Sequence, residues 1–139
     1  MSGEFFVNDA DRTLLRELRT ALLHLHKTLL DWQRAEFEQD RGPMPATQLL
    51  QFIFNDKAFA WLRPMSGLIV AIDEALAAKP PESPAMAPLL APARELAAPV
   101  AGSAYSVRYQ AALQELPEAV LAHRDLVTLL KLHSPQSRA

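Results

Sequence analysis

Large apolar side chains recur every three or four positions in the first third of the chain. Because an α-helix completes a turn in 3.6 residues, this spacing places them along one face of a helix. The row consists of Leu15, Leu18, Leu22, Leu25, Leu29 and Trp32. Further leucines on its flanks make the face wider than a coiled-coil seam, which is typical of a bundle helix. We expect Asn8 or Asp9 to cap this helix and the helix to end before Gly42–Pro43.

Prolines mark the bounds of the next two helices. The sequence has 11 prolines and four glycines, a balance that favours helices separated by prolines over turn-rich sheets. A second helix should follow Pro45 and end at Asn55–Asp56. Asp56 could then cap a short turn. We place Pro64 at the first position of a third helix, where its missing N–H costs nothing.

Six prolines fall between residues 79 and 102. Each one blocks the helical conformation of the residue before it or removes a backbone donor. We therefore predict an irregular crossover here, with room for a short helix around residues 88–98. The final helical region runs from Ser103 through His133 and is either interrupted or kinked at Pro117. Residues 134–139 are expected to form a flexible tail.

These elements predict one all-α domain over residues 1–139. A chain of 139 residues is long enough to bury one hydrophobic core. We expect an up-and-down bundle of four or more helices. The first and last long helices should pack together, with the segment from Trp61 to Leu76 against them and the Pro-rich segment 79–102 as a crossover.

Composition argues against several classes of function. Cysteine is absent, which excludes disulfides and thiol chemistry. The net charge is −2 and the basic residues are spread along the chain, whereas a nucleic-acid-binding domain concentrates them on one face. No apolar run has the length of a signal peptide or of a membrane span. We therefore expect a cytoplasmic protein that binds neither nucleic acid nor a membrane.

Two histidines in the first helix resemble a metal motif, but their spacing argues against one. Residues two apart on a helix point in nearly opposite directions, whereas pairs of helical ligands are three or four apart. His24 should therefore face solvent, while His26 projects into the apolar face. The sequence also lacks the Glu-x-x-His pairs of helical metal sites. We expect no metal and no cofactor.

Three more polar residues occupy apolar surroundings. His123 lies on a stripe with Val120 and Val127, and Asp73 lies at the edge of the third helix's apolar face. Arg63 precedes Pro64 at a helix entry. One explanation is structural: His123 would be a buried, neutral histidine with hydrogen-bond partners, and Arg63 and Asp73 would form an ion pair that only holds the fold together. The alternative is a ligand contact or an acid–base group at His123, with Arg63 as an anion clamp at the helix N-terminus.

A second apolar strip follows Pro117. Leu121, Leu129 and Leu132 lie away from the stripe that contains His123. A helix with two apolar faces either sits centrally in a bundle or uses one face for a partner. The strip is therefore a candidate partner interface, and a second copy of the chain is the first partner to consider.

Two segments of the chain carry a resemblance. LHLHKTLLDWQRAEFEQDRGP is followed by QLLQFIFNDKAFAWLRPMSGLIVAIDEAL, and together they cover about residues 23–76. The pair resembles a group of small uncharacterised bacterial all-helical proteins that combine Leu-His-Lys-x-Leu-Leu-Asp with Phe-Ala-Trp-Leu-Arg-Pro and Ile-Asp-Glu. The matching positions are His26, Lys27, Asp31, Trp61, Arg63, Pro64 and Asp73. The resemblance implies a bacterial setting and no particular activity.

Two functions are compatible with these patterns. The one we favour is a non-enzymatic interaction or scaffold protein, a homodimer or the partner of another protein, whose buried polar residues specify its packing. The other is a binding domain or enzyme for a small acidic metabolite. Its core pocket would be formed by His26, Trp61, Arg63, Asp73 and His123. Arg63 would hold the acidic group and a histidine would transfer a proton.

Overall fold

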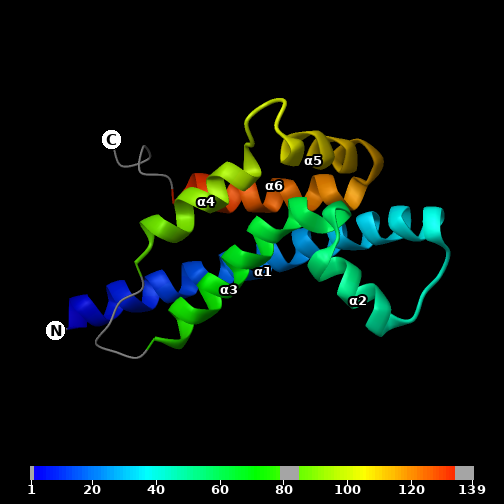
Figure 1. The fold of residues 1–139 in the computed structure, drawn as a ribbon. Coiled ribbons are helices and arrows are strands. Elements are labelled where there is room, and N and C mark those ends of the chain that lie inside the picture. Colours follow the sequence, from blue (N-terminus) through cyan, green and yellow to red (C-terminus); the bar gives the residue numbers. More distant parts are fainter. Residues whose placement is uncertain (1, 79–84, 134–139) are drawn as a thin grey trace.

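The structure, a computed structural model, describes residues 2–78 and 85–133. Across these residues it has six α-helices, one 3-10 helix and no strand, so the prediction of an all-α bundle is confirmed (Figure 1). The elements are α1 (Ser2–Arg41), α2 (Ala46–Asn55), η1 (Lys57–Leu62), α3 (Arg63–Ala77), α4 (Ala87–Ala97), α5 (Ala104–Glu115) and α6 (Pro117–Leu132). The tail predicted at 134–139 lies outside the described residues.

Helix α1 is the axis of the molecule, and its leucine row forms the centre of the core. Leu15, Leu18, Leu22, Leu25 and Leu29 have no exposed surface. Burial of each side chain contributes about 1.5–3 kcal/mol relative to its exposed state. Because α1 already begins at Ser2, the prediction that Asn8 or Asp9 caps it is wrong. Its predicted end is confirmed, since Gly42 has a left-handed φ of 81° and donates to the carbonyl of Glu38.

Two helices run back along α1. Figure 1 shows α3 and α6 antiparallel to α1, and both pack against it. The expected contact between the first and last long helices is therefore present. Pro64 is the second residue of α3, one position later than predicted, because Arg63 already has helical dihedral angles. Asp56 caps η1 as predicted, since its side chain accepts a hydrogen bond from the N–H of Ala58.

Helix α4 lies inside the segment predicted as an irregular crossover. It coincides with the short helix that we allowed around residues 88–98 and bridges α3 and α6. Pro88 stands in its first turn, and Pro92 lies inside it. The helix buries Leu89, Leu90, Ala93, Leu96 and Ala97, and this burial offsets the backbone bond that Pro92 cannot make. The short helix allowed within the crossover is therefore confirmed, while residues 79–84 lie outside the described residues.

The last helical region is interrupted, not kinked, at Pro117. Ser103 opens α5 by accepting a hydrogen bond from the N–H of Ser106. Leu116 then has extended dihedral angles (φ −117°, ψ 109°), and Pro117 begins α6. Proline disfavours the helical conformation of the residue before it, which explains the break at this position.

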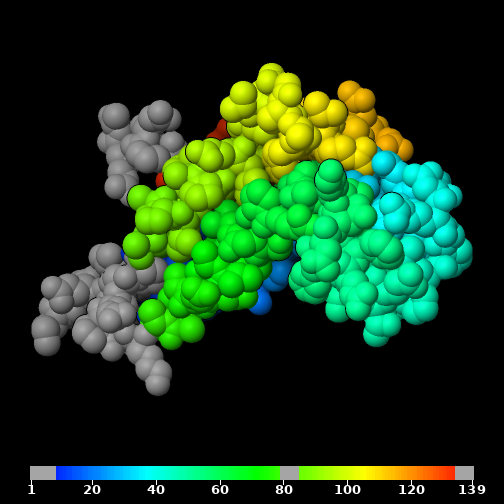
Figure 2. Space-filling view, in the orientation of Figure 1, coloured from blue at the N-terminus to red at the C-terminus, as the bar shows by residue number. Residues whose placement is uncertain are grey.

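Helix α2 stands apart from the main bundle. Among the described residues it packs against η1 and the end of α1, around a small separate core of Phe37, Leu49 and Phe59. In Figures 1 and 2 it forms a lobe beside η1 and α3. Only Leu49 of its ten residues is buried, so the main core does not depend on this helix.

Candidate functional site

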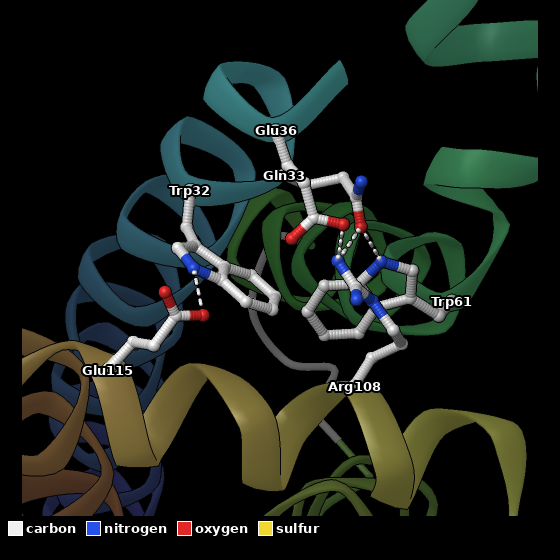
Figure 3. A network of polar contacts seen from close by, with 6 residues as sticks. All are labelled: Trp32, Gln33, Glu36, Trp61, Arg108 and Glu115. Carbon is white, nitrogen blue, oxygen red and sulfur yellow. Dashed lines mark hydrogen bonds and ion pairs between the residues drawn. The ribbon is translucent and has the colours of Figure 1, made fainter. Parts of the chain in front are cut away.

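The two tryptophans of the chain lie next to each other where α1, η1 and α5 meet (Figure 3). Trp32 comes from α1 and Trp61 from η1. Their ring centroids are 6.2 Å apart and the rings are nearly perpendicular, at 86°. Edge-to-face contacts of this kind are favourable because the positive ring edge meets the negative ring face. The pair forms one wall of a polar cluster.

Gln33 is the centre of this cluster. Its side chain is buried, with 4 % of the residue exposed. The Oε1 atom accepts hydrogen bonds from Nε1 of Trp61 and from Nη2 of Arg108, both at 2.8 Å. Two donors on one side fix the orientation of the amide, so Nε2 points the other way. That nitrogen donates to no other described residue.

Arg108 joins α5 to this cluster. Figure 3 shows its guanidinium reaching Gln33 and Glu36, and Nη2 lies 3.0 Å from Oε1 of Glu36. The guanidinium carbon is 4.4 Å from the ring centre of Trp32 and 5.8 Å from that of Trp61. Such cation–π contacts add to the ion pair. Both hydrogens of Nη2 are used, whereas Nη1 and Nε donate to no described residue.

A cavity of about 520 Å³ opens beside these contacts. Ala58, Ala60 and Ala104 line it, and their small side chains leave the space empty. Its polar and aromatic lining consists of Gln33, Glu36, Lys57, Trp61, Tyr105 and Arg108. We call this space the aromatic cavity.

A row of aromatic rings leads from the aromatic cavity to α6. Tyr105 stacks on Tyr109 at 5.2 Å, and the Tyr109 hydroxyl is hydrogen-bonded to Nδ1 of His123 at 2.7 Å. Tyr105 donates its hydroxyl proton to the carbonyl of Leu96 at 2.8 Å. Burial raises the pKa of Tyr105 and of Tyr109 and lowers the pKa of His123. All three groups are therefore held in their neutral forms near neutral pH.

The residues that we predicted to share a pocket have separate partners. Arg63 does not pair with Asp73: it is exposed and donates to the carbonyl of Asp56 at 3.0 Å. Asp73 instead forms an ion pair with Arg19. The pairing differs because α3 turns Asp73 towards α1, whereas Arg63, in the first turn of the same helix, lies back over η1.

The two histidines also lie outside the aromatic cavity, and Trp61 alone of the predicted set lines it. His26 is half-buried on α1, where burial lowers the pKa of its imidazole, and His24 is exposed as expected. His123 is only partly buried, because α6 turns the face that carries Ala119 and Ala122 towards the core. These small residues allow α6 to approach α1 closely.

The same rotation of α6 corrects the predicted partner interface. Leu129 is buried in the core, with 9 % of the residue exposed, so the strip of Leu121, Leu129 and Leu132 is not one exposed surface. Leu121 and Leu132 remain exposed.

Sequence reasoning missed the residues that carry the cluster. The spacing alone predicts Gln33 to be a rim residue of the first helix, although a glutamine beside Trp32 inside an apolar face is itself a sign of a buried polar contact. Tyr105, Arg108 and Glu36 gave no local signal, because their contacts cross from α5 to α1.

No protein-family model matches the chain, and no curated protein or solved structure is significantly similar to it. In the described part of the chain, no helix combines the length and the apolar character needed to cross a membrane. Within the same residues, no three His, Asp or Glu side chains gather as metal ligands would. We therefore infer the function from the contacts of this chain alone.

Proposed function

We propose that this chain is a non-enzymatic interaction protein that forms a homodimer through α2. The observation that supports the proposal is the exposed apolar face of this helix. Leu50 is 51 % exposed and Phe54 is 67 % exposed. Residues four apart on a helix lie side by side, so the two side chains form one apolar surface. Exposed apolar surface of this kind marks interaction sites in proteins.

The absence of charged side chains within α2 itself favours a second copy as the partner. Residues 42–55 contain no charged side chain. In a two-fold symmetric dimer each surface meets its own copy, so a charged residue near the axis would face a like charge. An uncharged helix with two large apolar side chains avoids this repulsion and buries Leu50 and Phe54 in both subunits.

Helix α6 is a weaker candidate for the interface. Its exposed leucines, Leu121 and Leu132, are eleven residues apart, and Leu129 between them belongs to the core. The proposed setting, the cytoplasm of a bacterium, rests on composition and on the sequence resemblance.

Sedimentation of matched variants tests the proposal. Phe54→Lys and Leu132→Lys both replace an exposed apolar residue, 67 % and 70 % exposed, in the last turn of a helix, where a positive charge suits the helix dipole. The wild type should sediment as a dimer at several hundred micromolar. The Phe54→Lys variant should be monomeric and the Leu132→Lys variant dimeric, with unchanged helix content by circular dichroism. A monomeric wild type, or equal dissociation of both variants, would contradict the proposal.

A further inference from the structure

The aromatic cavity has the size of a site for a small molecule. Its volume is about 520 Å³, within the range of about 300–1,000 Å³ that is usual for ligand pockets. The rings of Trp61 and Tyr105 both line it and lie against each other, with centroids 6.0 Å apart. Flat apolar walls favour a planar ligand, because a planar group makes full contact with an aromatic face.

Hydrogen-bond donors outnumber acceptors in the aromatic cavity. Nε2 of Gln33 donates to no described residue, and it is not fully enclosed, because every fully buried side-chain nitrogen and oxygen of the described residues has a partner. Nη1 and Nε of Arg108 and the ammonium group of Lys57 also lack a partner among the described residues. A ligand that accepts hydrogen bonds would therefore complete the site.

The charges of the lining select among acceptors. Arg108 and Lys57 contribute two positive charges and Glu36 one negative charge, which leaves one net positive charge. A monoanion neutralises this charge, whereas a phosphate dianion would exceed it and meet Glu36. A cationic ligand is disfavoured, because Arg108 and Lys57 would repel it.

We infer that the aromatic cavity is a binding site for a small planar monocarboxylate, such as an aromatic acid. The carboxylate accepts hydrogen bonds from Gln33 and from the free N–H groups of Arg108, while the ring lies against Trp61 and Tyr105. Lys57 at the cavity supplies the second positive charge. This activity is additional to dimerisation through α2.

The two indole N–H signals in an NMR spectrum report on the site directly, because both tryptophans of the chain lie in the cluster. Benzoate should shift the signal of Trp61 saturably. Benzamide, which has the same shape without the charge, should bind at least tenfold more weakly, and so should phenyl phosphate. Cyclohexanecarboxylate should bind at least threefold more weakly than benzoate. Absence of a saturable shift with benzoate, or equal affinity for benzamide, would overturn the inference.

Two substitutions test the assigned donors. Gln33→Glu keeps an oxygen that accepts from Trp61 and Arg108, but it replaces the free amide donor by a negative oxygen. Benzoate affinity should fall at least tenfold. Lys57→Gln changes an exposed residue, so the variant should fold like the wild type. It should lower the affinity for benzoate at least threefold. The control Lys131→Gln removes an exposed charge from α6 and should leave the affinity unchanged. Equal effects of the two lysine variants would refute the site.

Discussion

Replacing Gln33 by leucine should destabilise the protein more than replacement of an exposed glutamine. The substitution removes the one oxygen that accepts from both Trp61 and Arg108. An unsatisfied buried donor costs about 1–3 kcal/mol, which applies to the indole N–H of Trp61. The bond from Arg108 adds about 1–2 kcal/mol, because a charged hydrogen bond is strong but this side chain, 30 % exposed, can also reach water. Burial of the apolar leucine side chain stabilises the folded state by about 1 kcal/mol.

The expected net loss is therefore about 1–4 kcal/mol in the free energy of unfolding. Urea unfolding followed by circular dichroism measures it. Gln114→Leu is the matched control, since Gln114 is exposed on α5 and its substitution should change stability by less than about 0.5 kcal/mol. If Gln33→Leu were as stable as the control, the amide would not hold the three helical elements together, and the reasoning would be refuted.

Two further predictions concern the core and the pH dependence. Leu22→Ala should lower the free energy of unfolding, measured in urea, by about 2–5 kcal/mol, because Leu22 is fully buried. Leu23 is 38 % exposed, so Leu23→Ala should lower it by less than about 1 kcal/mol. Equal losses would place the core on another face of α1. Burial lowers the pKa of His26 and of His123 below the ordinary value of 6.5. The unfolded chain therefore binds protons that the folded chain does not, and stability should fall as the pH drops below about 6.5. A double variant, His26→Gln with His123→Gln, should show a smaller fall, and an unchanged slope would contradict the assignment.

Most of the fold could be predicted from the spacing of the leucines and the positions of the prolines, because both determine the conformation of the residues next to them. Leu15 to Leu29 specify one helix face through spacing alone, and Pro117 forces Leu116 out of the helical region whatever packs around it. The helix that contains Pro92 was harder to place. Its stability comes from the apolar side chains that it buries against α3 and α6, and that contact has no local signature.

The candidate site could not be predicted, because its contacts connect distant parts of the sequence. Trp61 and Gln33 are 28 residues apart, and Arg108 and Gln33 are 75 apart. Trp61 belonged to the predicted pocket, but nothing near it in the sequence indicates its partner. The position of His123 was misjudged for a related reason. Hydrophobicity alone predicts that α6 buries the face with Val120 and Val127. In the structure α6 instead buries the face with Ala119 and Ala122, because these small side chains allow close packing on α1.

Hydrogen–deuterium exchange at two protein concentrations tests the proposed role of α2 most directly. If a second copy covers α2, the amides of residues 46–55 should exchange more slowly at several hundred micromolar than at one micromolar. The amides at the exposed end of α6 should exchange at the same rate in both samples. Concentration-independent exchange throughout α2, or protection that appears at α6 instead, would contradict dimerisation through this helix.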